Sequence, residues 1–416
     1  MSYVNKTSER NNMATAELFS LALGLEAPWH VSDVKFDPAN RRLDLTIDFK
    51  RGSHFSCPEC GKSGCAVHDT NTRTWRHLDF FQYQAYLTAR VPRIGCEKCG
   101  VKQVAVPWAR PGSGFTLLFE ILALLLAQEM AIVPLAEILR VHPDSLWRIL
   151  GHYVEKAVQQ ADLSGLTHAG IDEIAKKKGH EYVTVFGDLR KSKVVYVADT
   201  RDSSVIEAFA DYLKSKEVPS EQIRHFCLDM WPAYLKGLEE HFSQSPLVFD
   251  RYHLMAKANS AVDMVRRQEA KEHVELKKTR YIWLKRKYKL SKEEEIKLAS
   301  LKRLNLKTAR AHAIIESLRE IWDATDKSEA RFLLKKWYFW ATHSRLEPIK
   351  EFAKTVRNHW EGILNVFDCY ITNGIIEGLN NKIKTAMKRA YGFKTFEYLR
   401  TIIFLVAGKL ALPTLS

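Results

Sequence analysis

The chain has 416 residues, which exceeds what one compact core usually holds and predicts two to four modules. Hydrophobic residues make up 46% and charged residues 27% of it, as in an ordinary soluble protein. The polar start lacks the apolar stretch of a signal peptide. The most apolar segment, residues 115–133, is interrupted by Glu120, Gln128 and Glu129, which excludes a membrane helix of about 18 or more apolar residues.

Lysine and arginine outnumber aspartate and glutamate by 63 to 49, and the sequence pI is about 9.3. Between residues 251 and 310, 18 Lys and Arg stand against 7 Asp and Glu, so +11 of the total +14 lies in this segment. A solvated helical face explains scattered charge, whereas a concentrated excess is more typical of phosphate binding. We therefore expect nucleic acid as a partner.

The N-terminal part is expected to form a helix, a hairpin and further strands. Residues 13–25 look helical, and two alternating segments, 29–36 and 42–49, are joined by a short turn as a hairpin. More strand-like sequence follows at 74–80 and 83–91. A linker comes next, marked by Pro107, Pro111, Gly112 and Gly114.

Four of the seven cysteines form two Cys-x-x-Cys pairs, each followed by a glycine. Two such knuckles suit a tetrahedral four-thiolate zinc site, which is structural because no coordination position stays open. Four buried cysteines or a redox pair are the alternatives, and Cys65 or His68 is a candidate to replace one ligand. The odd number of cysteines argues against a secreted disulfide scaffold and favours a reduced cytoplasm. The predicted zinc ligands are Cys57, Cys60, Cys96 and Cys99.

The segment after the linker has the pattern of a helix-turn-helix. The second, recognition helix is expected to start at Asp144 and to direct Asp144, Ser145 and Arg148 toward base edges or phosphates. Arg140 occupies the turn position where glycine is preferred, so a plain αα-hairpin is the alternative. The expected helix starts are at Pro134 and Pro143. The apolar or small packing positions are Leu135, Ala136, Leu139, Val141, Leu146 and Ile149.

A run of strands and helices follows in the order βββαβαβ. This combination of a meander with crossover helices implies a mixed sheet covered by helices. The expected strands are 167–175, 182–189, 193–199, 223–229 and 247–250, and the expected helices are 203–216 and 233–241.

Residues 251–365 contain one glycine and one proline, so long helices are expected there. A further helix at 375–389 is followed by a break at 391–393 and a last apolar helix near 396–410. The tryptophans of the long segment are expected in its core, unless one of them wedges against an unstacked base at a DNA end. They are Trp283, Trp322, Trp337 and Trp340.

Three carboxylates from separate segments carry the candidate chemistry. Asp172 lies in the first strand, Asp229 ends the fourth, and Glu377 lies on a late helix. Converging carboxylates can hold two divalent metals about 3.5–4 Å apart, which activate a nucleophile and stabilise the leaving oxygen of a phosphoryl displacement. Mg²⁺ suits such a site. The spacing alone is weak evidence, because the chain has 49 acidic residues.

Four blocks of the chain resemble the ISL3 family of bacterial insertion-sequence transposases. They read IDEIAKKKGHEYVTVFGDL, CLDMWPAY, VFDRYHLMAKAN and TNGIIEGLNNKIKTAMKRAYGFKTFEYLR, and the likeness covers nearly the whole chain from about residue 30. The resemblance implies a DDE transposase with an N-terminal zinc ribbon, a helix-turn-helix and an RNase H-like catalytic domain. It also implies Asp172, Asp229 and Glu377 as the catalytic triad, with Mg²⁺ or Mn²⁺ as the metal.

Strand geometry separates the triad from neighbouring acids. Glu173 follows the first triad aspartate in a strand, so its side chain faces the opposite side of the sheet. Asp250 also ends a strand and is the rival of Asp229. In an RNase H-like sheet the first and fourth strands are central neighbours, which favours Asp229. Asp250 then pairs with a basic residue just after it, Arg251 or His253.

Polar residues that follow the third carboxylate on its helix are candidate DNA contacts. Asn380, Asn381 and Lys384 lie three, four and seven positions on, hence on the same face, where they position phosphates or orient the carboxylate. A solvated polar stripe is the alternative. A basic and aromatic surface continues from there with Lys388, Arg389 and Tyr391.

We therefore expect a multidomain α/β protein whose RNase H-like mixed-sheet core is interrupted by a large all-α insertion. It binds the terminal inverted repeats of an insertion sequence and catalyses metal-dependent strand cleavage and transfer, as a dimer or larger assembly on double-stranded DNA. The alternatives are a catalytically inactive, domesticated DNA-binding regulator and an RNase H-like nuclease that cuts without joining. The expected parts are 1–112 (hairpin and zinc ribbon), 113–162 (helix-turn-helix), 163–250 with 366–416 (catalytic domain) and 251–365 (basic helical insertion).

Overall fold

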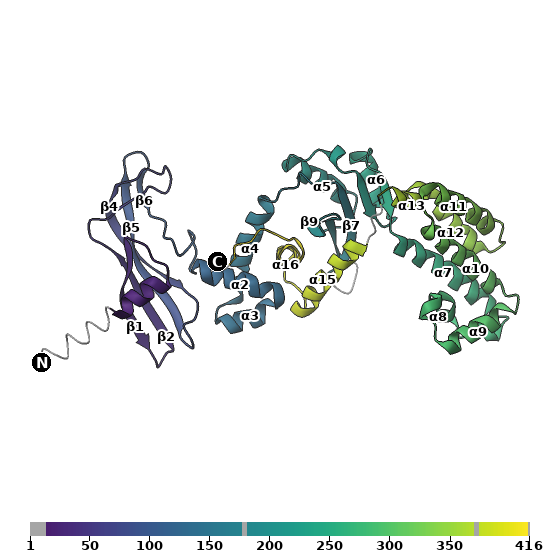
Figure 1. Ribbon diagram of the computed structural model, residues 1–416, viewed down its shortest axis with the longest axis horizontal. Helices are drawn as coiled ribbons and strands as arrows, with labels where there is room; N and C mark the ends of the chain where they lie inside the picture. The colour runs from purple at the N-terminus through teal and green to yellow at the C-terminus, as the bar shows by residue number, and fades with distance from the viewer. Residues whose placement is uncertain (1–13, 177–180, 370–373, 415–416) are drawn as a thin grey trace. The chain divides into compact units, whose positions relative to one another are not determined.

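The computed structural model describes residues 14–176, 181–369 and 374–414 (Figure 1). The chain divides into two compact units, Met1–Tyr153 with Leu412–Ser416, and Val154–Ala411. The first unit contains a β-rich part and the helix-turn-helix, and the second contains a mixed sheet and a helical region.

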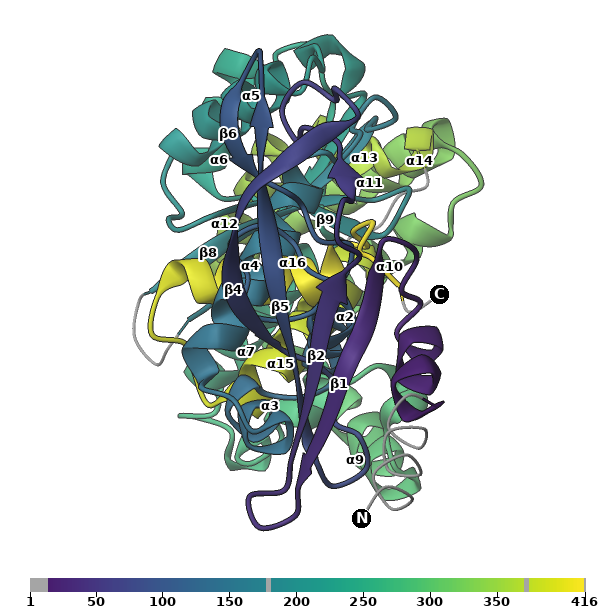
Figure 2. The same ribbon diagram turned by 90° about the vertical axis from the view of Figure 1, so that its left-hand side faces the viewer.

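A six-stranded sheet forms the β-rich part of the first unit. Its strands lie in the order β1-β2-β5-β4-β3, with β6 paired to β5, and the long strands β1, β2, β5 and β4 run side by side in Figure 2. Alternate residues of β2 and β5, among them Leu43, Leu45 and Leu87, are buried in a core that also includes Phe19 of a helix over residues 14–22. The strands are β1 (Trp29–Asp37), β2 (Arg42–Phe49), β3 (His54–Phe55), β4 (Cys65–Arg76), β5 (Gln84–Cys96) and β6 (Gly100–Gln103).

The β1–β2 hairpin is confirmed, but the hairpin of β4 and β5 differs from the prediction. β4 ends at Arg76, so only the first residues of the strand predicted at 74–80 are extended. Residues 77–83 connect the two strands instead, and there the backbones of Phe80 and Tyr83 bond to each other in both directions. Periodicity misplaced this turn because its residues are as apolar as those of a strand.

Helices α2 (Leu117–Glu129), α3 (Ile132–Leu139) and α4 (Pro143–Gln159) confirm the helical segment predicted after the linker. Pro143 is the first residue of α4, as expected. α3 begins two residues before Pro134, which corrects the predicted start. A proline is tolerated at that position because the first four N–H groups of a helix have no acceptor within it.

A buried carboxylate joins the linker to these helices. Glu120 of α2 is fully buried and accepts hydrogen bonds from Arg110 Nε at 3.0 Å, Ser113 Oγ at 2.7 Å and Tyr153 of α4 at 2.8 Å. A buried charge without partners is strongly destabilising, so these three donors hold the linker, α2 and α4 in one arrangement.

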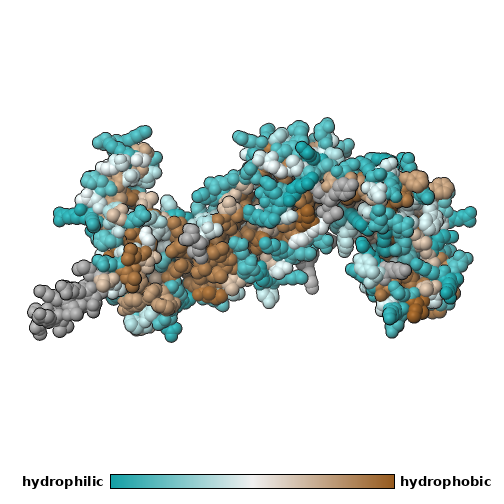
Figure 3. Space-filling model, in the orientation of Figure 1, coloured by the Kyte–Doolittle hydropathy of each residue, from teal (hydrophilic) through white to brown (hydrophobic). Residues whose placement is uncertain are grey.

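Apolar side chains gather on the surface of α2 and α3, where Figure 3 is brown. The exposed residues there are Leu118, Leu125, Val133 and Ile138. Within the part of the chain that the structure describes, no helix has both the length and the apolar character needed to cross a membrane.

The second unit contains a five-stranded mixed sheet in the order β11-β10-β7-β8-β9. β7, β8 and β9 form an antiparallel meander, whereas β10 and β11 run parallel to β7, which confirms the predicted βββαβαβ order. Helices α5 and α6 cover one face, and α15 packs on the other with α16 beside it. The strands are β7 (His168–Ala175), β8 (Tyr182–Asp188), β9 (Lys193–Ala198), β10 (His225–Leu228) and β11 (Leu247–Phe249). The helices are α5 (Ser204–Ser215), α6 (Pro232–His241), α15 (Gly374–Ala390) and α16 (Phe396–Ala407).

The segment between β11 and α15 is helical, as predicted, and has its own apolar core. Trp283 and Trp337 are buried in that core, whereas Trp322 is only partly buried and Trp340 is 41% exposed. The prediction that these tryptophans are mostly core residues holds for Trp283 and Trp337, and Trp322 packs against the same core while only partly buried. The helices are α7 (Arg251–Glu269), α8 (Arg280–Leu284), α9 (Lys292–Lys302), α10 (Lys307–Arg319), α11 (Lys327–Thr342), α12 (Glu347–Asn358), α13 (Trp360–Leu364) and α14 (Val366–Cys369).

The end of this helical segment packs against the edge of the sheet. Gly362 of α13 lies so close to the ring of Phe249 in β11 that a Cβ at this position would overlap it. The Asn365 side chain donates a hydrogen bond to the carbonyl of Leu247 at 2.9 Å. Both contacts hold the start of α14 beside β11, and α15 packs on β7.

Candidate active site and metal sites

The four cysteines of the two knuckles come together in the first unit. Their Sγ atoms all lie within 4.8 Å of one another, and Cys60 Sγ is 3.7 Å from Cys96 Sγ. A zinc ion with four thiolates at about 2.3 Å would separate neighbouring sulfurs by about 3.8 Å, so the cluster fits a tetrahedral zinc. Gly61 and Gly100 both have a φ of +73°, the left-handed conformation that closes each knuckle and that glycine adopts at little cost.

The two cysteines of the second knuckle differ in acidity: the hydrogen bond with Cys60 and burial raise the pKa of Cys99 to about 12, whereas Cys96 is held closer to thiolate. Backbone N–H groups of Cys99 and Lys98 lower the pKa of Cys96 from its ordinary 9.0 to about 6. Cys65 is buried nearby, but its thiol donates to the carbonyl of Lys62 and stands outside the four-sulfur cluster. His68 pairs with Asp69 instead. Neither alternative ligand joins the cluster.

The predicted DNA-reading residues lie at the start of α4. Asp144 and Arg148 are exposed, and Arg148 donates to Ser145 Oγ at 3.1 Å. Arg140, in the turn before α4, adopts the left-handed conformation with a φ of 55°, and its guanidinium pairs with Asp79 of the β4–β5 connection. This ion pair explains how an arginine is accepted where glycine was expected, since it ties the turn to the sheet.

In the second unit, three aspartates follow the same register across neighbouring parallel strands. The β7–β10 pairing sets Cys227 opposite Gly170, and continued by two residues it sets Asp229 opposite Asp172. The β10–β11 pairing sets Leu228 opposite Phe249, and continued by one residue it sets Asp229 opposite Asp250. We call Asp172, Asp229 and Asp250 the aspartate row. Asp229 and Asp250 directly follow the ends of β10 and β11, whereas Asp172 lies within β7, and Asp229 is the middle member of the row.

Helix α15 reaches the aspartate row because two strands carry glycine beneath it. A Cβ at Gly170 would lie 2.5 Å from Ile376 Cγ1, and one at Gly187 would lie 2.6 Å from Ile376 Cδ1. Ile376 therefore packs directly on the backbone of β7 and β8. One turn later on the helix, Asn380 Nδ2 donates to Asp172 Oδ2 at 2.6 Å.

Asp172 and Glu173 face opposite sides of the sheet, as predicted. Glu173 accepts a hydrogen bond from the Tyr234 hydroxyl of α6 at 3.0 Å, on the face away from α15. Burial raises the pKa of Asp172, and the charges of His253 and Lys384 only partly offset this.

His253 of α7 lies between the other two aspartates. Its Nδ1 is 3.2 Å from Asp229 Oδ2, and its Nε2 is 3.6 Å from Asp250 Oδ2. The hydrogen bond to Asp229 raises the pKa of His253. Burial alone would raise the pKa of Asp229, but the hydrogen bond and charge of His253 outweigh it and the pKa lies below its ordinary value. Asp250 also caps α7 by accepting the Tyr252 N–H at 2.9 Å.

The carboxylates do not meet as a compact metal cluster. Among the described residues, the four cysteines are the one group of three or more potential ligands whose donor atoms all lie within 4.8 Å. Glu377 is exposed on α15 and lines, together with Asp250, a pocket of about 640 Å³. Asn381, Lys384 and Lys388 of the same helix are also exposed, and Arg389 is half-buried.

Sequence reasoning missed two contacts of this region. Tyr234 holds Glu173, and Arg251 stacks on Trp322 with its Cζ 4.7 Å from the ring centroid. No local pattern marks either pair, because the partners lie 61 and 71 positions apart in the chain.

Comparison with known proteins gives matches along most of the chain. A family model described as a transposase matches residues 169–403, and one described as the helix-turn-helix domain of transposase family ISL3 matches residues 104–154. A third, described as the zinc-finger of transposase IS204/IS1001/IS1096/IS1165, matches residues 53–99.

The transposases of two insertion sequence elements are similar to this chain over most of their length. The transposase for insertion sequence element IS1557 of Mycobacterium tuberculosis is 26% identical over 431 residues, covering 94% of this chain and 96% of the relative. The transposase for insertion sequence element IS1001 of Bordetella parapertussis is 26% identical over 351 residues, covering 82% of this chain and 86% of the relative.

Proposed function

The chain belongs to the ISL3 family of transposases, and we propose that it binds the terminal inverted repeats of its own element and performs metal-dependent strand cleavage and strand transfer there. Membership in the family makes it a DNA-binding transposase with a zinc ribbon and a helix-turn-helix. The observation that carries the finer proposal is the aspartate row, with Asn380 and Glu377 brought to it by α15.

We infer an RNase H-like catalytic domain from the sheet. An antiparallel meander of three strands is followed by two parallel strands, and the fourth strand lies beside the first. The helices between β11 and α15 then form an insertion with a core of its own. This supports the proposed division into 1–112, 113–162, 163–250 with 366–416, and 251–365.

The proposed catalytic triad is Asp172, Asp229 and Glu377. Asp229 is preferred to Asp250 because it occupies the middle of the row, next to Asp172. Asp250 has a structural task, since it caps α7 and holds His253. Glu173 is not a candidate because its side chain is held by Tyr234 on the opposite face.

The donor set fits Mg²⁺ or Mn²⁺, which prefer oxygen ligands. All the side chains concerned are carboxylates, and the buried Oδ1 of Asn380 is an acceptor beside Asp172 that has no partner among the described residues. When bound, the ions supply activation of the attacking hydroxyl and charge neutralisation at the leaving oxygen. Asn380 holds the carboxylate of Asp172, and His253 holds that of Asp229.

DNA contacts are proposed on two surfaces. The start of α4 reads the terminal repeat through Asp144, Ser145 and Arg148. The structural zinc site of the ribbon helps to position this part of the first unit on the DNA. The exposed face of α15 contacts the phosphates near the cleavage point. Its contact residues are Asn381, Lys384 and Lys388, which are exposed, and the half-buried Arg389, whereas the buried Asn380 orients the carboxylate of Asp172. Both element ends and the target must be held together, so we propose a dimer or larger assembly on double-stranded DNA, acting at the nucleoid in a bacterial cytoplasm.

Substitution of single carboxylates tests the proposal. Asp172→Asn, Asp229→Asn and Glu377→Gln should each bind terminal-repeat DNA normally and fail to cleave it, because each loses charge stabilisation of the transition state. Cleavage is measured on labelled DNA with Mg²⁺ or Mn²⁺ and without added divalent ions, and binding by mobility shift. Glu173→Gln is the matched control and should cleave.

The other outcomes separate the alternatives. If Asp250→Asn is inactive while Asp229→Asn still cuts, the second carboxylate is misassigned. Wild-type binding without any cleavage would identify a DNA-binding regulator, and cleavage without joining of ends would identify a nuclease. Cleavage that survives all three triad substitutions would disprove the triad.

A further inference from the structure

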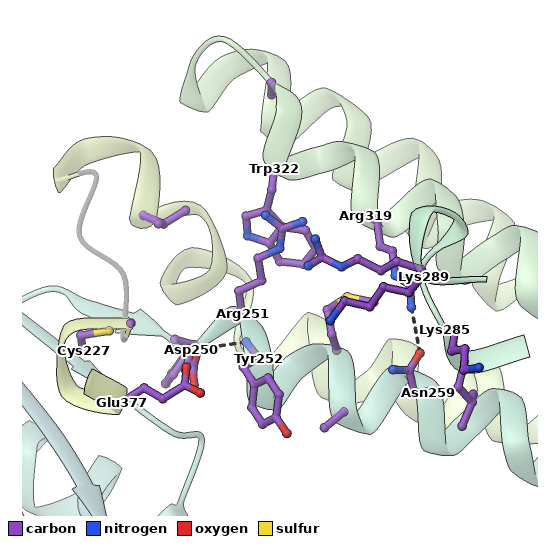
Figure 4. Close-up of a pocket in the computed structure, with 18 of the residues that line it drawn as sticks. Cys227, Asp250, Arg251, Tyr252, Asn259, Lys285, Lys289, Arg319, Trp322 and Glu377 are labelled. Carbon is purple, nitrogen blue, oxygen red and sulfur yellow. Dashed lines mark hydrogen bonds between the residues drawn. The ribbon is translucent and has the colours of Figure 1, made fainter. Parts of the chain in front are cut away.

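One pocket of the second unit runs from the candidate carboxylates into the helical insertion. Asp250 and Glu377 lie at one end of it, and Arg251 points away from them to Trp322 (Figure 4). We call it the Trp322 pocket. Its volume of about 640 Å³ lies within the range of about 300–1,000 Å³ typical of pockets that hold one small ligand. It therefore suits a single nucleotide better than a double helix.

The Trp322 pocket is strongly basic beyond its carboxylate end. Five cationic side chains line it, and Asp250 and Glu377 are its two acidic lining residues. Two of the cations are partly neutralised elsewhere, since Arg319 pairs with Glu316 and Lys285 with Glu294. Arg286 and Lys289 are exposed and have no carboxylate partner within the described ranges. The cations are Arg251, Lys285, Arg286, Lys289 and Arg319.

Arg251 lies over the ring of Trp322 inside this pocket, and we call the two side chains the Trp322–Arg251 platform. The guanidinium carbon of Arg251 lies 4.7 Å from the centre of the Trp322 ring. The Nε of Arg251 is buried and has no hydrogen-bond partner in the part of the chain that the structure describes. Arg251 is half-buried and forms no ion pair within the described ranges; burial, Arg286 and Arg319 disfavour its charge and Asp323 favours it, so an anionic ligand would stabilise the charge further.

These features together match the chemistry of a nucleotide. Unstacked bases bind proteins by stacking on aromatic side chains or on arginine guanidinium planes, and their phosphates bind Arg and Lys. A platform and a group of cations beside the carboxylates would therefore accept a base with its phosphates close to the bond to be cut. A surface that only followed the backbone of a duplex would need the cations but not the platform.

We propose that the Trp322 pocket holds one unpaired nucleotide of the DNA strand at the element end, with its base on the Trp322–Arg251 platform and its phosphates on Arg286, Lys289 and Arg319. The proposal rests on the proposed function, because it takes the ligand to be the DNA that the carboxylates cut. It assigns to the helical insertion the task of holding a base outside the duplex.

Binding measurements with the full chain test the pocket without any cleavage step. Fluorescence anisotropy, without added Mg²⁺ or Mn²⁺, compares two end duplexes, one fully paired and one whose terminal nucleotide is unpaired by a mismatch. The wild type should prefer the unpaired end. Trp322→Ala should lose this preference by at least about fivefold, the lower limit expected for stacking of one base, and Trp322→Phe should retain it. Trp340→Ala, which removes an exposed tryptophan outside the pocket, should also retain it.

Charge variants supply a second comparison that does not disturb the core. Arg286→Ala with Lys289→Ala should weaken binding of the unpaired end more than that of the paired end. Lys292→Ala with Lys297→Ala removes the same charge from exposed positions of α9 outside the pocket and should weaken both equally. This pair keeps the test decisive if Trp322→Ala proves unstable in a thermal melt.

Three outcomes would overturn the proposal. The first is that Trp322→Ala prefers the unpaired end as strongly as the wild type does. The second is that the two pairs of charge substitutions weaken binding of the unpaired end equally. The third is that the wild type loses its preference when a free deoxynucleoside monophosphate is added at the concentration of the DNA. The last would make the pocket a site for free nucleotides. Asp172→Asn should bind both ends as the wild type does, so failure of the pocket and failure of the catalytic triad are separate results.

Discussion

Asn380 is the side chain that links α15 to the aspartate row. It is 2% exposed, and its Nδ2 holds Asp172 Oδ2 at 2.6 Å. Because Asp172 is half-buried and its pKa is raised, its carboxylate depends on such donors to keep one orientation. Its neighbour Asn381 points to solvent on the same helix. The two asparagines are therefore adjacent in sequence but unlike in environment.

We predict that Asn380→Ala lowers the cleavage rate by about 10–100-fold, the usual effect of removing a partner that orients a metal-binding carboxylate. DNA binding and the thermal unfolding temperature should change little in comparison. Asn381→Ala is the comparison: as an exposed phosphate contact it should weaken DNA binding, whereas its cleavage rate at saturating DNA should stay within about threefold of the wild type. Equal losses in both variants would show that the asparagines act only through DNA contact. Cleavage and mobility-shift assays on the same DNA measure these effects.

The position of α15 depends on close packing against two glycines. Ile376 fills the space that a Cβ at Gly170 or Gly187 would occupy, so the helix lies directly on β7 and β8. Gly378 of the same helix is exposed, and a Cβ added there would meet no neighbouring atom within 4 Å. An added methyl group should therefore lower the free energy of unfolding at position 170 and leave it unchanged or raise it at position 378.

Gly170→Ala is expected to lower the free energy of unfolding by about 1–3 kcal/mol, since overpacking shifts Ile376 and the helix. It should also abolish cleavage, because Asn380 and Glu377 move with α15. Gly378→Ala should be neutral or raise the free energy of unfolding by up to about 1 kcal/mol through helix propensity. Thermal or urea unfolding of the two variants measures this, and equal stabilities would contradict the packing described for Ile376.

The helix-turn-helix provides a test of base reading. Arg148→Ala should weaken binding to the terminal repeat by about 1–3 kcal/mol while changing binding to random DNA much less, if the side chain contacts a base. Lys156→Ala, at an exposed position near the other end of α4, should affect both DNAs equally or not at all. An equal loss for Arg148→Ala on both DNAs would make it a phosphate contact. Unchanged binding would leave α3 and α4 as a structural hairpin.

The division into two units separates the zinc site from the candidate catalytic site along the chain. The four cysteines belong to the first unit, and the aspartate row and α15 belong to the second. Each unit has its own buried core. Damage to the zinc site should therefore spare the fold of the catalytic part.

Purified protein is expected to carry about one zinc per chain, because four thiolates make one closed tetrahedral site. Cys57→Ser should lose the zinc and bind the element end more weakly, since the metal contributes to folding of the ribbon. Limited proteolysis should still yield a stable fragment that begins near residue 154. Cys65→Ser is the matched control and should keep its zinc. Full zinc retention after Cys57→Ser combined with Cys96→Ser would contradict the site.

The sequence by itself determined the features that depend on local spacing. Two Cys-x-x-Cys-Gly knuckles predict a four-sulfur cluster because each knuckle is one turn of five residues. The βββαβαβ order followed from periodicity, and the opposite orientation of Asp172 and Glu173 followed from strand alternation. Periodicity failed in the connection of β4 and β5, where apolar turn residues resemble a strand. It also failed at the start of α3, where a proline inside the first turn was read as the first residue of the helix.

Only the tertiary structure decided which distant side chains meet. Asn380 and Asp172 are 208 positions apart, and no local pattern pairs them. Sequence proposed His253 as a partner of Asp250, whereas the fold also places it against Asp229. The register of β10 between β7 and β11 put Asp229 in the middle of the aspartate row. Likewise, the tryptophans of the helical segment between β11 and α15 look alike in sequence, but packing buries Trp283 and Trp337 and leaves Trp322 facing Arg251. Such choices depend on contacts between remote segments, which the fold as a whole establishes and which short-range periodicity does not encode.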